Sequence, residues 1–586
     1  MRRYIKIIAA LCLCLACAGL CGCNNNNTPA DSTSDTTPLP TPDTTTVQPD
    51  DGKLHIIEGG KVKYDLITPI LSDEATKQAA ERLTNGFREV TGLKLKSFDD
   101  YVEVGQTHDD DTYEILLGQT SYGQSAQIYS GMKYNDYRVT VVGHKIVVAA
   151  YNEECLNAAV DWTLEQFKSA LSGSGDSAAL VLEGLEHSVT SQDYTVSSWT
   201  IGGNDLGLYR FVYSDANVLE TLQKMRVELA QLTGYYLDIV KDTAEAGEYE
   251  ILVGQTNRSE SAKVGLQDYL HYRFELVGNK LVLRAGGMHS LAKTTAAFVS
   301  MFATDKTEVA IPAGFSLDGN YFDDPYNNTV MADGSDIRVM SCNILAEYES
   351  YNGRIPVVFR KEVFFAALDY YQPTIIGIQE FSPAWYECLS EYRDIDKYEI
   401  FEVVSPNGKD LYFTTILYRK DLLEVIDSGT HKYSVGNNMR GRCVSWGLFK
   451  VRATGKVFGF TSTHLDGFDS PDTDIQIAEW AEIVHKLAES GPVMATGDFN
   501  TAESMNDFND IQTSSGMRDL RYDCEVRLNE EGSYHDLGNP MSGYGLALDH
   551  IFATQNAIGK RFEMLIFNEQ IWGSDHSWVL CDVALN

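Results

Sequence analysis

Six short polar segments follow apolar, strand-like runs in the C-terminal part of the chain. They are rich in Asn, Asp, Glu and His, the side chains that hold a hard divalent cation, bind a phosphate and activate water. One such segment would mean little, because Asp and Asn also end strands as turn formers. Six in succession predict a site for metal-dependent hydrolysis of a phosphate ester. The segments are Ser341-Cys342-Asn343, Gln379-Glu380, Thr463-His464-Leu465-Asp466, Gly497-Asp498-Phe499-Asn500, Leu548-Asp549-His550 and Ser574-Asp575-His576.

Strands and helices that could position these segments alternate along the same part of the chain. The ends of several strands can converge on one rim of a sheet. Helical segments at 357–371 and 475–487 lie between the strand-like runs, which predicts a layered α/β domain. Four of the runs that precede polar segments are Ile337–Met340, Ile375–Ile378, Val457–Phe460 and Val493–Thr496.

In this order, the polar segments resemble the motifs of the endonuclease/exonuclease/phosphatase superfamily. This is the fold of pancreatic-type deoxyribonuclease, abasic-site endonucleases, bacterial sphingomyelinases and inositol polyphosphate 5-phosphatases. The resemblance covers 337–586 and rests on the ordered set more than on any single motif. It implies a four-layered α/β sandwich, two packed sheets flanked by helices, with the site at the strand ends.

The cation and phosphate ligands follow from residue chemistry, with the resemblance as a guide. Glu380 is the best single metal ligand, because a carboxylate that ends a buried strand is costly to desolvate without a cation. A helix N-cap or a salt bridge is the alternative role. Asn343 can hold the metal or a phosphate oxygen, and Asp575 is a second candidate metal ligand. The expected ion is Mg²⁺, with Mn²⁺ or Ca²⁺ as alternatives. Arg442 lies where many relatives carry a phosphate-binding arginine.

The catalytic roles combine titration chemistry with the same resemblance. His576 is the candidate general base, because imidazole titrates near neutral pH. Asp549 is the carboxylate that would fix its tautomer, as in other His–Asp pairs. The resemblance implies that Asp498 and Asn500 orient the nucleophile and protonate or steady the leaving oxygen, with Asn500 also facing the phosphate. His464 would donate to the phosphate or the leaving group. A structural hydrogen bond is the alternative for each histidine.

Two positions depart from the family pattern. Relatives often carry a glutamate that pairs with the histidine of the Thr-His-Leu-Asp motif, whereas this chain has Lys409-Asp410-Leu411-Tyr412 in that neighbourhood. The partner of His464 is therefore left open. Leu345 stands where abasic-site enzymes carry an acidic ligand, which disfavours that branch and favours a single principal metal ligand.

The N-terminus predicts export and lipid anchoring. Residues 1–22 have a basic start and an apolar stretch, as in a secretory signal peptide. Leu20-Cys21-Gly22-Cys23 resembles a bacterial lipobox, which implies cleavage before Cys23 and diacylglycerol attachment to its thiol. An ordinary signal peptide is the alternative. Residues 23–52 are polar and predict an extended linker. The protein is thus expected at the outer face of the bacterial cell membrane.

Residues 53–190 and 191–321 are predicted to be two copies of one small α+β domain. Tyr113–Thr120 recurs as Tyr249–Thr256, and Tyr137–Lys145 recurs as Tyr272–Lys280. Each copy has a helix, a strand, a Gly-Gln-Thr turn and a hairpin. The pattern looks like accessory domains of bacterial glycoside hydrolases. The copies share no acid–base constellation, so a spacer or a module for a glycan or another cell-envelope ligand is favoured. The polar segment 322–336 is the expected linker.

Composition limits the functions that remain. The 586-residue chain has a formal net charge of −36, which disfavours nucleic-acid binding through a broad basic face. A bound cation can still reverse the local field. Of eleven cysteines, those beyond residue 23 are scattered without zinc-type spacing, and no disulfide pair is indicated.

The sequence therefore predicts a surface-anchored phosphoesterase, with phosphodiester cleavage of extracellular nucleic acid as the first choice. Hydrolysis of a phospholipid or an inositol phosphate is the second. The remaining alternative is a surface protein that binds glycan or peptide and carries a degenerate phosphoesterase domain.

Overall fold

The computed structural model describes residues 51–103, 105–322, 324–346, 356–401, 413–436, 442–468, 470–529, 531–538, 545–565 and 571–586. The predictions for the signal peptide, for Cys23, for the linker up to residue 50 and for 409–412 lie outside the described residues. Within them, no helix combines the length and the apolar character needed to cross a membrane.

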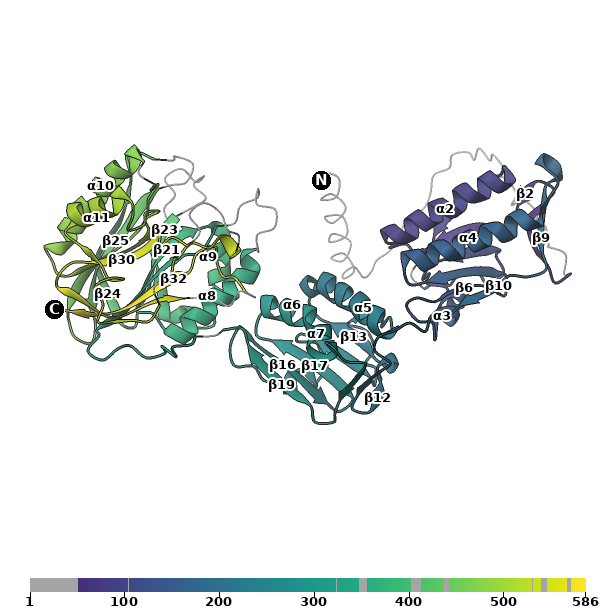
Figure 1. Cartoon of the computed structure of the whole chain (residues 1–586), viewed down its shortest axis with the longest axis horizontal. Coiled ribbons are helices and arrows are strands. Elements are labelled where there is room, and N and C mark those ends of the chain that lie inside the picture. Colours follow the sequence, from purple (N-terminus) through teal and green to yellow (C-terminus); the bar gives the residue numbers. More distant parts are fainter. Residues whose placement is uncertain are drawn as a thin grey trace, which may run out of the picture.

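The first copy of the duplicated domain contains two sheets and two long helices (Figure 1). Its six-stranded sheet has the order β10 (Glu186–Val189), β6 (Tyr137–Val142), β7 (Lys145–Ala150), β5 (Glu114–Leu117), β3 (Asp65–Thr68) and β4 (Ser97–Asp99). The smaller sheet has the order β2 (Lys61–Val62), β1 (Leu54–Glu58), β9 (Ala179–Leu182) and β8 (Leu171–Ser172). The helices are α2 (Glu74–Thr91), α3 (Gly123–Tyr129) and α4 (Glu153–Ala170).

The second copy repeats this arrangement. Its six-stranded sheet has the order β14 (Ile239–Lys241), β13 (Arg210–Tyr213), β15 (Glu250–Val253), β17 (Lys280–Ala285), β16 (His271–Val277) and β19 (Ser316–Asn320). The smaller sheet has the order β12 (Asn204–Asp205), β11 (Ser198–Ile201) and β18 (Glu308–Ile311). The helices are α5 (Leu219–Thr233), α6 (Met288–Ala296) and α7 (Phe298–Ala303).

Local chemistry explains why the two copies fold alike. The side chain of Asp73 caps α2 by accepting from the Thr76 N–H, and Gly92 ends that helix in the left-handed conformation. In the second copy, the side chain of Asp215 accepts from the Asn217 N–H and caps the short 3-10 helix Ala216–Val218 directly before α5, and Gly234 ends α5 in the left-handed conformation. Both large sheets are mixed, with the same strand order. The copies differ in the smaller sheet, where β1 and β9 are antiparallel but β11 and β18 are parallel.

The C-terminal domain, green to yellow in Figure 1, is built on two mixed sheets. The seven-stranded sheet has the order β22 (Tyr398–Ile400), β23 (Phe413–Arg419), β21 (Ile375–Phe381), β20 (Ile337–Asn343), β32 (Trp578–Leu585), β31 (Ala557–Leu565) and β29 (Val526–Arg527). The six-stranded sheet has the order β24 (Leu423–Lys432), β25 (Cys443–Val451), β26 (Val457–His464), β27 (Val493–Asp498), β30 (Asp549–Ala553) and β28 (Arg518–Asp519).

Three apolar cores arrange this domain in four layers. Val339 of β20 and Phe460 of β26 lie in one core between the two sheets. Met340, the next residue of β20, lies in the core with α8 (Val357–Tyr371) and α9 (Pro383–Leu389). Helices α10 (Pro471–Ala488) and α11 (Asn506–Ser515) pack with the other face of the six-stranded sheet. The predicted four-layered sandwich is therefore confirmed, and strands buried on both faces explain the nearly continuous apolar runs.

The second copy and the segment after it pack against the C-terminal domain. Glu362 of α8 is 2% exposed and accepts hydrogen bonds from the backbone N–H groups of His289, at 2.8 and 2.9 Å, and of Ser290, at 3.3 Å, at the start of α6. In the segment expected to be a linker, Asn328 is 3% exposed, and its amide donates to Oε2 of Glu563 at 2.7 Å. This segment therefore lies against the domain that follows it.

Candidate active site

The ends of five strands bring the polar segments together. Asn343 ends β20 in register with Gln379 of β21, so Glu380 lies one residue beyond that pair. In the other sheet, Asp498 of β27 pairs with His464 of β26 on one side and with Asp549 of β30 on the other. Stacking of the two sheets places both groups on the same rim, as the strand-end pattern predicts.

Asp498 is the centre of the cluster. Its Oδ2 accepts from Nδ2 of Asn343 at 3.0 Å and lies 3.3 Å from Nε2 of His464 and 3.8 Å from Nε2 of His576. Its Oδ1 accepts from the backbone N–H of Asn500 at 2.9 Å. Asp498 is 2% exposed, and this burial raises its pKa to about 7. The carboxyl group can therefore hold or release a proton near neutral pH.

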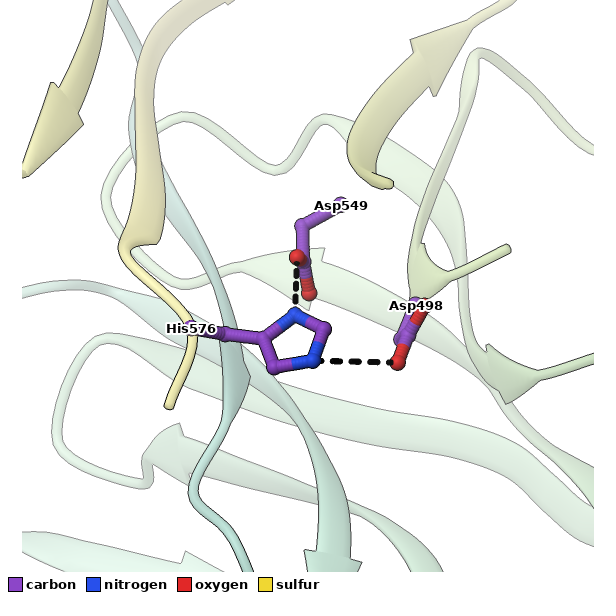
Figure 2. Close-up of side chains that lie close together, drawn as sticks. All are labelled: Asp498, Asp549 and His576. Carbon is purple, nitrogen blue, oxygen red and sulfur yellow. Dashed lines mark hydrogen bonds and ion pairs between the residues drawn. The ribbon is translucent and has the colours of Figure 1, made fainter. Parts of the chain in front are cut away.

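His576 and Asp549 form a buried pair (Figure 2). Nδ1 of His576 lies 2.7 Å from Oδ2 of Asp549, and its Nε2 faces Asp498. Burial lowers the pKa of His576, but the carboxylates of Asp549 and Asp498 outweigh it, so the pKa lies well above the usual value of 6.5. The carboxylate of Asp549 fixes a proton on Nδ1, which leaves Nε2 to exchange protons with a reacting group.

Backbone contacts hold this pair in place. Oγ of Ser533 accepts from the N–H groups of Leu548 at 2.9 Å and of Asp549 at 3.1 Å. The neighbouring Tyr534 pairs with His576 in a single antiparallel backbone bridge, and the centroids of their rings lie 5.0 Å apart. The segment around Ser533 therefore positions both members of the pair, although no sequence motif indicates it.

His464 and Asn500 lie together beside Asp498. Nε2 of His464 is 3.1 Å from Nδ2 of Asn500, which also donates to the carbonyl of Leu465 at 2.9 Å. Asn500 has a φ of 49°, a left-handed conformation that asparagine tolerates better than most residues. Asp498 and Asn500 thus supply neighbours for His464, whose partner the sequence left open.

Hydrogen bonds with backbone groups fix Asn343 and Glu380 at the ends of β20 and β21. Oδ1 of Asn343 accepts from the N–H of Leu345 at 3.0 Å, and its carbonyl accepts from Nε1 of Trp578 at 2.9 Å. Oε2 of Glu380 accepts from the N–H of Ala346 at 2.9 Å. Glu380 has a φ of 58° at a bulge in β21, a strained conformation typical of functional positions. Leu345 is buried, and its backbone N–H is the donor to Asn343.

Arg442 contacts Asp466, and Asp575 contacts Ser574. Nε of Arg442 donates to Oδ1 of Asp466 at 2.9 Å, and Gln476 of α10 donates to Oδ2 of the same aspartate at 2.9 Å. This network lies two residues beyond His464. Asp575 is 7% exposed, and its Oδ1 accepts from Oγ of Ser574 at 3.3 Å.

The donor set fits a hard cation. Oxygen ligands of carboxylates and amides suit Mg²⁺. One oxygen each from Asp498 and Asp549 and one ring nitrogen of His576 lie within 4.8 Å of one another. Oδ1 of Asp549 is buried and lacks a hydrogen-bond partner in the described part of the chain, as a cation ligand would. Glu380 and Asn343 lie at adjacent strand ends on the same rim.

Histidine 550, inside a predicted motif, is structural. Its Nδ1 lies 2.7 Å from Oδ2 of Asp519, and its Nε2 lies 2.9 Å from the carbonyl of Thr501. Burial lowers the pKa of His550, but the carboxylate of Asp519 outweighs this and raises it overall. Sequence reasoning missed Asp519, Ser533 and Gln476, because each meets its partner only in the folded domain.

The comparisons with known proteins concern the C-terminal domain. Residues 340–576 match the model of the Endonuclease/Exonuclease/phosphatase family. No curated protein matches the chain. One similar structure is the endonuclease/exonuclease/phosphatase from Bacteroides vulgatus, with 23% identity over 43% of this chain and 99% of that one, at a TM-score of 0.38.

Two further structures resemble the same part of the chain. The mannosyl-6-phosphatase of Bacteroides thetaiotaomicron has 21% identity over 42% of this chain and 99% of its own, at a TM-score of 0.36. TDP2 from D. rerio, complexed with a single-stranded DNA product, has 18% identity over 42% and 98%, at a TM-score of 0.34. The family match to residues 340–576 shows that the C-terminal part of this chain is a domain of the endonuclease/exonuclease/phosphatase family.

Proposed function

We propose that this protein is a divalent-cation-dependent phosphoric ester hydrolase that uses water as the nucleophile. The observation that carries the proposal is the buried cluster in which Asp498 faces both His464 and the His576–Asp549 pair. A histidine oriented by one carboxylate can accept a proton from water, and a second titratable group beside it can supply a proton to the leaving group.

His576 acts as the general base in this proposal. Its Nε2 is 3.8 Å from Asp498, longer than a hydrogen bond, so a water molecule can compete for it. Asp549 stabilises the imidazolium that forms when His576 takes the proton. Water then attacks phosphorus in line with the leaving oxygen, and no covalent bond to the protein forms.

Charge on the phosphoryl group and the leaving oxygen is stabilised by neighbouring donors. Asn343 and Asn500 would donate amide hydrogens to phosphoryl oxygens, and His464 would donate to the phosphate or to the leaving oxygen. Asp498, with a pKa of about 7, would supply the proton for that oxygen. Arg442 would bind a phosphoryl oxygen while Asp466 holds its Nε.

Glu380, with Asn343 and Asp575, would hold the cation, which we propose to be Mg²⁺. A bound divalent cation neutralises charge that develops on phosphoryl oxygens. Support comes from the oxygen donors at adjacent strand ends and from the strained backbone at Glu380. The alternative ligands are Asp498, Asp549 and His576, whose donor atoms also lie close together.

For the substrate, we propose the phosphodiester bonds of extracellular nucleic acid. A second candidate class is a small phosphate ester such as an inositol phosphate, or the headgroup of a phospholipid. The net charge of −36 favours this second class, because long polyanions are repelled more strongly than small ones. We further propose that a lipid on Cys23 tethers the protein to the cell membrane and that residues 53–321 bind a glycan or another envelope ligand.

A substrate panel with matched variants tests the proposal. The purified protein is assayed for phosphate ester cleavage on plasmid DNA, single-stranded DNA, RNA, sphingomyelin, inositol phosphates and sugar phosphates, with Mg²⁺ or with EDTA. We expect cleavage of at least one substrate that requires the cation and is lost in His576→Ala. His431→Ala is the matched control, because His431 is partly exposed and pairs with Glu479. Cleavage that survives both EDTA and His576→Ala would refute the proposal.

A further inference from the structure

Two cysteines of the C-terminal domain have their sulfur atoms in contact. Sγ of Cys524 lies 3.3 Å from Sγ of Cys581, and both are free thiols in this structure. Cys581 lies in β32 and is fully buried, whereas Cys524, between β28 and β29, is partly exposed. A cysteine pair with one accessible member and one buried member can react in sequence with an external oxidant.

The backbone around Cys524 is fixed against the strand that neighbours Cys581. The N–H of Glu525 donates to the carbonyl of Gly559 at 3.2 Å, and Val526 pairs with Arg561 of β31. Phe562 of β31 is the register partner of Cys581. A side chain at Gly559 would overlap Sγ of Cys524, so glycine makes room for this sulfur. The contact between the thiols therefore follows from strand pairing as well as from side-chain placement.

We propose that Cys524 and Cys581 are an oxidative modification site at which an intramolecular disulfide forms. A disulfide has an S–S distance of about 2.05 Å, so the sulfurs must approach by about 1.3 Å. Small rotations of the two cysteine side chains would supply this movement. Export to an oxidising compartment would favour the oxidised form.

The oxidant is another disulfide, of a small molecule or of a thiol–disulfide oxidoreductase. The thiolate of Cys524 attacks it, forms a mixed disulfide and releases the first reduced thiol of the oxidant. The thiolate of Cys581 then attacks the sulfur of Cys524 and releases the second. The two cysteine protons pass to solvent or to the released thiolates, and one external disulfide is reduced to two thiols. Burial raises the pKa of Cys581 well above its usual value, so this second step should accelerate as pH rises.

The bond would close a loop that carries the His576–Asp549 pair. The cysteines are 57 residues apart, and Ser533, Asp549 and His576 all lie between them. A disulfide restricts the unfolded chain and so stabilises the folded one. We expect an unfolding midpoint about 5–10 °C higher in the oxidised protein. Turnover at 25 °C should change little, because the pair is already in place while the thiols are free.

Peptide mapping tests the proposal on the full chain. The protein is equilibrated with oxidised glutathione, denatured, alkylated and digested, and the peptides are compared with and without reduction. We expect one species that joins the peptides of Cys524 and Cys581 and separates on reduction. Complete alkylation of both cysteines after oxidation, or pairing of either with a different thiol, would overturn the proposal.

Variants separate the disulfide from a general effect on folding. In Cys524→Ser, Cys581 should be alkylated in full, and the reductant-dependent part of the unfolding midpoint should vanish. Cys388→Ser, in α9, is the matched control and should keep both the linked peptide and the shift. A reductant-dependent midpoint of wild-type size in Cys524→Ser would show that this disulfide does not produce the effect.

Discussion

Nδ1 of His576 and Oδ2 of Asp549 lie 2.7 Å apart across the two sheets of the C-terminal domain. Asp549 begins β30 of the six-stranded sheet, and His576 lies two residues before β32 of the seven-stranded sheet. The pair therefore exists only when the two sheets are packed together. Formation of the His576–Asp549 pair therefore depends on packing of the core between the sheets.

His576→Ala and Asp549→Asn should act as one unit. We expect His576→Ala to lower kcat at least about a hundredfold, the usual worth of a positioned base. The double variant should be little slower, because Asp549 acts through the histidine. Single and double variants are compared by kcat at saturating substrate, with circular dichroism to confirm folding. Losses that multiply would show that the two residues act independently.

The pH dependence of kcat/KM should report the raised pKa of His576. A general base works when unprotonated, so activity should first rise with pH, with the midpoint of this rise above the usual value of 6.5. At higher pH activity should fall, because Asp498 must hold a proton to supply it to the leaving oxygen. Asp549→Asn removes a carboxylate that raises this pKa, so the midpoint should move to lower pH while the plateau falls. Profiles are measured at constant Mg²⁺, with Asp427→Asn on β24 as an exposed control. A midpoint that stays in place in Asp549→Asn would contradict the assignment.

Glu380→Gln should distinguish between the two candidate sets of cation ligands. If Glu380 holds the ion, the variant should lose at least about a hundredfold in activity and bind Mg²⁺ more weakly, with the fold unchanged. Glu387→Gln, on the exposed face of α9, is the control. Metal affinity is measured by calorimetry in the same variants and in Asp549→Asn. Affinity lost in Asp549→Asn but kept in Glu380→Gln would place the ion on the Asp498, Asp549 and His576 cluster.

Glu362→Gln should reduce the pH dependence of stability. Burial raises the pKa of Glu362 to about 7, against the lowering effect of the backbone N–H groups of His289, Ser290 and Met288. Because the folded pKa lies above the unfolded value of 4.5, the folded chain binds more protons between these pH values. The contribution of this group to stability is thus full below pH 4.5 and is lost as pH rises through about 7.

The titration of Glu362 should lower the free energy of unfolding by about 3 kcal/mol between pH values below 4.5 and pH values above about 7. Glutamine does not titrate, so the unfolding midpoint of Glu362→Gln should change less between pH 5 and pH 8 than that of the parent protein. Differential scanning calorimetry of the full chain measures this, with Glu391→Gln as the matched control, because Glu391 is an exposed partner of Lys361. An unchanged pH slope in Glu362→Gln would contradict the prediction.

Cys23→Ser tests the lipid anchor. Membrane affinity of a lipoprotein depends on buried acyl methylenes, so the variant should leave the detergent phase in a partitioning assay or remain an unprocessed precursor. Cys17→Ser is the control, because Cys17 lies before the lipobox and the variant leaves Leu20-Cys21-Gly22-Cys23 intact. A processed Cys23→Ser protein that still enters the detergent phase would show that the lipobox reading is wrong.

The family, the layered α/β fold and the identity of the rim residues could be predicted from the sequence alone. This was possible because strand-end motifs are local: each polar segment follows its own apolar run, as Asn343 follows Ile337–Met340. Helix α8 runs from Val357 to Tyr371 as predicted, because its apolar residues and its boundaries are both encoded nearby. The order of the motifs along the chain predicted the family.

Tertiary structure alone decided which of these side chains meet. Asp498 lies within 4 Å of both His464 and His576 because β27 pairs beside β26 while the other sheet brings His576 to the same edge. The contacts of Asp519 with His550, Ser533 with Asp549 and Cys524 with Cys581 join residues far apart in sequence. No local pattern encodes such contacts, because they depend on how the sheets and loops pack.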